Sequence, residues 1–151
     1  MRSGTRRLRK FVRLPAAERR LLVKAALLLV AIRLGLGLIP FQTLRHLLAQ
    51  VAEAPTGFRG TNRSSTEGIA RAVEVAGRHL PGAGTCLTQA LAAEVLLRRQ
   101  GYPSLLHIGV LRGEEGQLEA HAWLKSGDKV VIGGGELERY TPLALLEGEK
   151  Q

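Results

Sequence analysis

The sequence predicts an α+β fold in which a basic helical segment precedes a small body of helices and an antiparallel sheet. Two observations predict this class. Apolar residues recur with a helical period up to about residue 99, and from residue 104 they alternate with a period of two. The 151 residues, of which 45% are hydrophobic, suffice for one compact domain or for a small domain with a helical extension.

The first part of the chain has a helical pattern. Residues 1–10 are expected to form a flexible basic start. A helix is expected over about 15–34, because a proline and an acid suit its first turn. Glycines and a proline then interrupt the pattern before a short helix over 41–50.

Part of this segment, LLVKAALLLVAIRLGLGLIPF, is apolar over a length close to that of a membrane span. Lys24 and Arg33 interrupt it, so its longest uncharged run is shorter than the roughly 18 residues that a span needs. We therefore expect a helix that is buried or covered by a partner. Residues 15–41 are also expected to be able to make peripheral contact with a membrane.

A turn-rich stretch, APTGFRGTNRSST, divides the chain. It predicts a linker over 54–66 between a helical segment, 1–53, and a core, 67–151. The charge divides similarly: residues 1–50 hold eleven Lys/Arg and one acid, whereas residues 51–151 hold eleven Lys/Arg and twelve acids. The basic segment suits an acidic partner, an anionic membrane or nucleic acid, and a solvated basic arm is the simplest alternative.

The body is predicted to contain two helices followed by three strands. The helices are expected over 66–79 and 86–99, and the strands over 104–112, 118–124 and 129–134. The stretches GEEGQ and SGD are predicted to be the turns between the strands.

Cys86 is a candidate nucleophile. It is the only cysteine, so no intrachain disulfide can form, and a reducing compartment, the cytoplasm, is expected. It falls in the first turn of a predicted helix, after a glycine-rich loop. Unpaired backbone N–H groups there favour a thiolate and can stabilise an oxyanion. A small core hydrophobe is the alternative role of a free cysteine.

His121 strengthens the catalytic interpretation. In LEAHAWL it shares one face of a strand with Glu119 and Trp123. A cysteine at a helix start and a histidine on an adjacent strand form the papain-type pair of thiolate nucleophile and imidazolium acid. Trp123 and Gln89 are expected to line this site.

Several stretches resemble a known family. TCLTQALAAEVLLRRQGYPSLLHIGVLR, followed by EAHAWL, VVIGG and ERYTPL, is similar to the lasso-peptide leader peptidases of the separate-protease type, within the transglutaminase-like cysteine-protease superfamily. The resemblance covers nearly the whole chain. It implies a papain/transglutaminase-like core with Cys86 as nucleophile and His121 as general acid/base. No cofactor is implied, and no zinc-spaced cluster or phosphate loop is present in the sequence.

The sequence does not determine which residue would be the third member of a catalytic triad. The family often has an aspartate about twelve residues after the histidine, where this chain has Gly133. A two-residue hairpin turn would place His121 opposite Gly134. The imidazole would then be held by Glu136, Glu138, a backbone carbonyl or a partner's residue. Glu136 is our side-chain candidate, because the preceding glycines would let the backbone bring it back toward the ring.

The resemblance implies proteolysis of a ribosomally made lasso-peptide precursor. The partners implied are the precursor peptide, a separate PqqD-like leader-recognition protein and an asparagine-synthetase-like lasso cyclase. A transglutaminase-like acyltransferase would use the same two residues, with an amine in place of water. A non-enzymatic basic adaptor, on an acidic partner or a membrane, is the other alternative. Few aromatic residues and no helix-turn-helix pattern argue against nucleic acid.

Overall fold

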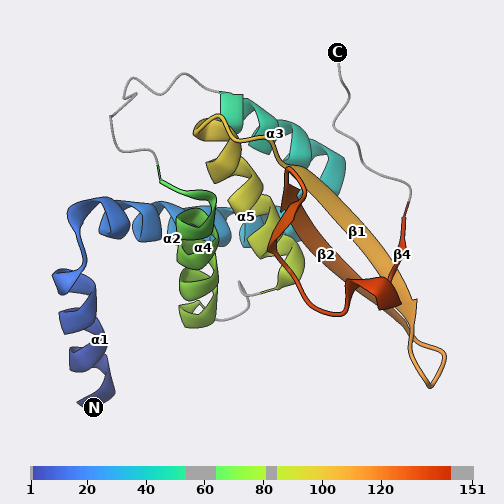
Figure 1. Ribbon diagram of the computed structural model, residues 1–151, viewed down its shortest axis with the longest axis horizontal. Coiled ribbons are helices and arrows are strands. Elements are labelled where there is room, and N and C mark those ends of the chain that lie inside the picture. The colour runs from blue at the N-terminus through green and yellow to red at the C-terminus, as the bar shows by residue number, and fades with distance from the viewer. Residues whose placement is uncertain (1, 54–63, 81–84, 144–151) are drawn as a thin grey trace.

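The computed structural model describes residues 2–53, 64–80 and 85–143. This part contains five helices, a short 3₁₀ helix and a four-stranded antiparallel sheet (Figure 1). The helices are α1 (Arg2–Arg13), α2 (Ala16–Leu38), α3 (Phe41–Glu53), α4 (Thr66–His79) and α5 (Cys86–Arg99). The strands are β1 (Leu105–Arg112), β2 (Leu118–Ser126), β3 (Lys129–Ile132) and β4 (Thr141–Pro142), with the 3₁₀ helix η1 (Leu137–Arg139) before β4. The predicted α+β class is confirmed.

The body helices have the predicted bounds, whereas the N-terminus differs from expectation. Residues 1–10 were expected to be flexible, but α1 begins at Arg2. Arginine, lysine and leucine favour a helix, and Leu8, Phe11 and Val12 fall on one side of it. Most of the predicted linker, residues 54–63, lies outside the described residues, as does the loop 81–84.

Helix α2 continues past the glycines that were expected to end it. A Cβ atom at Gly35 would lie 2.7 Å from Leu44 of α3. The glycine therefore permits close packing of the two helices, and the helix ends only at Leu38, before Ile39 and Pro40.

The core lies between α2, α4, α5 and one face of the sheet. Helix α2 contributes a buried row, namely Leu21, Ala25, Leu29 and Ile32. Helix α5 is buried along most of its length, from Ala90 to Leu97. Helices α2 and α3 thus share one hydrophobic core with the elements that follow the predicted linker.

The sheet has the order β3-β2-β1-β4, so β3 and β4 are its edges. Its core face bears Leu106, Ala122, Leu124 and Ile132. By register, the opposite face carries His107, His121 and Trp123, with His107 paired to Trp123 and Gly109 paired to His121. Strand β4 and η1 were not predicted, because each is too short to carry a periodic signal.

A pair of leucines on α2 tests whether this helix belongs to the core. We expect Leu29→Ala to lower the free energy of unfolding by about 3 kcal/mol, because Leu29 is fully buried and truncation leaves a cavity. Leu27 is 66% exposed, so Leu27→Ala on the same helix should change stability by less than about 0.5 kcal/mol. Urea unfolding measures both. Equal stability of the two variants would mean that α2 is not part of the cooperative unit.

Candidate active site

Cys86 is held by the capped start of α5. Thr85 is the N-cap, and its Oγ1 accepts a hydrogen bond from the backbone N–H of Thr88 at 3.4 Å. The two threonine hydroxyls lie 2.6 Å apart, and the Thr88 side chain is fully buried. The N–H of Gln89 bonds to the Thr85 carbonyl. The N–H groups of Cys86 and Leu87 thus have no partner within the helix, so they can face an anion beside the half-buried thiol.

His121 of β2 is oriented by the main chain. Its Nε2 lies 2.8 Å from the carbonyl oxygen of Gly133. Because a carbonyl only accepts hydrogen bonds, Nε2 must carry the proton. In the neutral ring this leaves Nδ1 as the acceptor, which is the state that a base for the Cys86 thiol requires.

Gly133 can make this contact because it is a glycine. Its φ is +75°, and a Cβ atom there would lie 2.5 Å from the carbonyl oxygen of Ala122. Any other residue would strain or displace the backbone that presents the carbonyl. The main-chain carbonyl of Gly133 therefore holds the imidazole ring of His121.

The predicted hairpin turn is present, but the register beyond it differs from expectation. Ser126 pairs with Lys129, and Leu124 then pairs with Ile132, because a bulge shifts the ladder by one residue. An uninterrupted ladder would have paired Leu124 with Val131 and His121 with Gly134. The pairing of β2 with β3 ends at Ile132, so His121 meets the Gly133 carbonyl through its side chain instead.

Two aromatic rings support the imidazole. The rings of His121 and Trp123 are stacked with centroids 6.2 Å apart, and Tyr140 lies 5.1 Å from His121. A Cβ atom at Gly109 would come within 2.9 Å of both Trp123 and Tyr140, so this glycine lets both side chains pack against β1. Trp123 is 5% exposed and also stacks on His107. It thus packs behind the catalytic candidate and does not line the pocket described next.

One pocket brings the two predicted catalytic residues together. It has a volume of about 380 Å³. Its lining comes from α4, α5, β2 and the end of β3, namely Glu74, Arg78, Cys86, Gln89, His121, Ile132, Gly133 and Gly134. Gln89 lies one turn after Cys86, and a Cβ at Gly77 would come within 2.7 Å of its side chain. Gln89 lines the pocket, and its role there stays a prediction.

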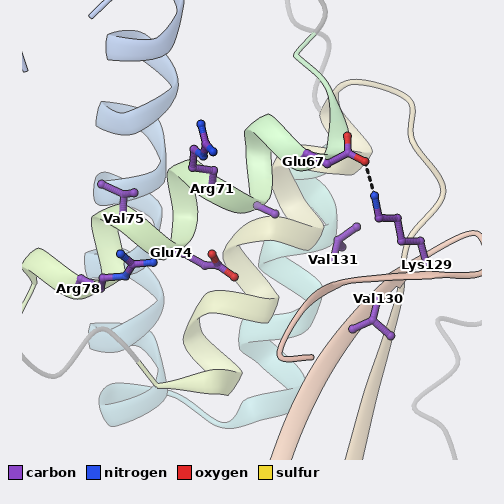
Figure 2. A pocket seen from close by; sticks show the side chains of 9 residues that line it. Glu67, Arg71, Glu74, Val75, Arg78, Lys129, Val130 and Val131 are labelled. Atoms are coloured by element: carbon purple, nitrogen blue, oxygen red, sulfur yellow. Dashed lines mark hydrogen bonds and ion pairs between the residues drawn. The ribbon is translucent and has the colours of Figure 1, made fainter. Parts of the chain in front are cut away.

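A second, larger pocket adjoins the first. It has a volume of about 600 Å³ and lies between α4 and β3 (Figure 2). It shares Glu74 and Arg78 with the pocket of Cys86. Figure 2 shows the ion pair of Glu67 and Lys129 joining α4 to β3. The hydrogen bond from Lys129 lowers the pKa of Glu67 to about 2. Glu74 and Arg78 of α4 thus line both pockets, and the larger pocket lies next to that of Cys86.

The structure does not bring the predicted third member to the ring. Glu136 is exposed and forms an ion pair with Arg139 at 2.7 Å. Glu138 and Asp128 are exposed as well. Sequence reasoning gave a backbone carbonyl only as one of several alternatives, and it missed Tyr140 and Gly109. Tyr140 lies in the motif ERYTPL, and this motif could have indicated it as a site residue.

The comparisons with known proteins assign the chain to one superfamily. Among the described residues, no group of three or more His, Cys, Asp or Glu is arranged to hold a metal ion. No curated protein and no solved structure matches the chain. A model of the transglutaminase-like superfamily, which includes cysteine proteases and acyltransferases, matches residues 26–145. Because this match covers most of the chain, from within α2 to beyond β4, the protein belongs to the transglutaminase-like superfamily.

Proposed function

We propose that this protein is a cysteine peptidase that removes the leader from a lasso-peptide precursor. The observation that carries the proposal is the shared pocket of Cys86 and His121, in which His121 donates from Nε2 to the Gly133 carbonyl. The superfamily supports a cysteine nucleophile. The lasso-peptide substrate rests on the resemblance of the motifs around these two residues.

The residues suit acyl transfer to the cysteine. Nδ1 of His121 takes the proton of the Cys86 thiol, and the thiolate attacks the carbonyl carbon of the scissile peptide bond. The N–H groups of Cys86 and Leu87 stabilise the oxyanion. The imidazolium then protonates the leaving amine, which is the N-terminus of the core peptide, and the leader remains as a thioester on Cys86. Water, deprotonated by His121, hydrolyses that thioester and releases the leader with a free carboxylate.

The two adjoining pockets beside α4 suggest where the precursor would bind. Strand β3 is an edge of the sheet, and edge strands can pair with an extended peptide. The adjoining pocket is lined on the α4 side by charges of both signs, including Arg71, Glu74 and Arg78 (Figure 2). An extended peptide with charged side chains would thus reach Cys86 along β3.

The proposed reaction takes place in the cytoplasm with separate partners. A PqqD-like protein would bind the leader, and an asparagine-synthetase-like cyclase would close the freed amine onto an acidic side chain of the core peptide. The superfamily also includes acyltransferases. Product analysis distinguishes a peptidase from an acyltransferase. Hydrolysis leaves a carboxylate on the leader, whereas acyl transfer leaves an amide between the leader and the attacking amine.

Loss of either member of the pair should abolish cleavage. We expect Cys86→Ala and His121→Ala each to lower the rate of precursor cleavage by at least about 10³-fold, since a nucleophile and its base act as a unit. The measurement is peptide cleavage followed by mass spectrometry, with melting curves to show that both variants fold. A Cys86→Ala variant that cleaves at the wild-type rate would refute a cysteine peptidase.

The glycines allow a direct test of what orients His121. Gly133→Ala should lower the cleavage rate by about 10²-fold or more, because it displaces the carbonyl that fixes the tautomer. Gly134→Ala is the matched control, since a Cβ there meets nothing closer than 3.8 Å. Glu136→Gln should also retain activity. The rates are compared at a temperature at which all three variants are folded. A large loss in Glu136→Gln alone would instead identify Glu136 as the third member.

Leader selectivity should depend on a second protein. We expect the purified chain to cleave its precursor slowly, and the PqqD-like partner to raise kcat/KM by at least about tenfold through effective concentration. The reason for this expectation is that α1 to α3 form no strand-rich recognition domain. Rapid, leader-selective cleavage by the chain alone would contradict this.

A further inference from the structure

Helix α2 has two apolar sides, and the fold covers only one of them. Its buried row packs in the core against α4 and α5. On the opposite side lies a second apolar row with helical spacing, whose members are 43–80% exposed: Val23, Leu27, Val30, Leu34 and Leu38. Only 22% of the most apolar 18-residue window of α2 is buried. A helix with two apolar rows requires cover on both sides, so the exposed row is a candidate binding surface.

Helix α1 has a similar exposed row beside a high density of cations. Leu8, Phe11 and Val12 fall on one side of it and are 67%, 38% and 61% exposed. The residues between and around them are basic: Arg6, Arg7, Arg9, Lys10 and Arg13. Figure 1 shows α1 projecting from the body. A short helix with an apolar stripe and a basic remainder is typical of helices that lie in the headgroup region of an anionic bilayer.

The charge indicates which occupant covers these rows. Residues 1–50 carry eleven Lys/Arg and one acid, Glu18. A second copy of the chain would bring two such segments together and would be repelled. An anionic lipid bilayer suits both the cations and the apolar rows. Its headgroups attract the cations, and its acyl chains accept the leucines and valines.

The helix would lie on the bilayer and would not cross it. By length and composition α2 could span a membrane. However, crossing would remove Leu21, Ala25, Leu29 and Ile32 from the core that they share with α4 and α5. We infer that α1 and the exposed row of α2 form a docking surface for an anionic lipid bilayer, which holds the enzyme at the membrane face while α4, α5 and the sheet remain in water.

Vesicle co-sedimentation of the full chain tests this inference. The vesicles are made either of phosphatidylcholine alone or of equal parts of phosphatidylcholine and phosphatidylglycerol. We expect binding to the anionic vesicles to be at least tenfold tighter, and to weaken at high salt because salt screens the cations. Leu27→Gln/Leu34→Gln should weaken binding to the anionic vesicles by at least tenfold, since it removes the middle of the apolar row.

A matched control separates the surface from general exposure of leucine. Leu118 is 71% exposed on β2, so Leu118→Gln should bind vesicles as the wild type does. Arg6→Gln/Arg7→Gln/Arg9→Gln should weaken binding to anionic vesicles only.

Four outcomes would overturn the inference. They are wild-type protein that stays in the supernatant with anionic vesicles, equal binding to both vesicle types, full binding by the Leu27/Leu34 variant, and a wild-type dimer that this variant dissociates. The last outcome would assign the surface to a second copy. Peptide cleavage by the variants, which leave the pocket of Cys86 intact, is measured separately.

Discussion

The hydrogen bond from His121 Nε2 to the Gly133 carbonyl is the contact on which the candidate site depends. It fixes the tautomer of the neutral imidazole and leaves Nδ1 as the acceptor. Three local features make it possible: the bulge that shifts the β2–β3 ladder, the end of that ladder at Ile132, and the positive φ of Gly133. A regular hairpin with an ordinary residue at position 133 could not present the same carbonyl.

The other half of the site depends on the hydrophobic core. Cys86 begins α5, and α5 is buried from Ala90 to Leu97 between α2, α4 and the sheet. On the side of α3, Glu94 pairs with Arg98 at 3.2 Å and with Arg45 at 3.8 Å. Burial raises the pKa of Glu94, although the two guanidinium groups oppose the rise. The thiol is therefore positioned by a helix that cannot shift without disturbing the whole core.

The sequence allowed prediction of much of this arrangement. The period of apolar residues indicated the body helices and β1 to β3, and the chemistry of a helix start and a strand face indicated Cys86 and His121. The group that holds the imidazole could not be predicted, because a main-chain carbonyl has no residue type and the bulge leaves no mark in HAWLKSGDKVVIGG. The sharing of one core by α2 and α5 was also missed, because a helix with two apolar rows has no single buried face to indicate its neighbours.

A carbonyl in place of a carboxylate changes the electrostatics of the proposed catalytic pair. A carboxylate would both orient the imidazole and stabilise its cationic form, whereas the Gly133 carbonyl orients the ring with only a dipole. In the proposed mechanism, other groups must then stabilise the thiolate–imidazolium pair. The N–H groups of Cys86 and Leu87 at the start of α5 can donate hydrogen bonds to an anion in the pocket. Glu74 is the one carboxylate among the described residues that line the pocket, and Arg78 lines the same pocket. In the proposed mechanism, orientation and charge stabilisation, which a catalytic aspartate combines, would thus be divided between a glycine carbonyl and the surfaces of α4 and α5.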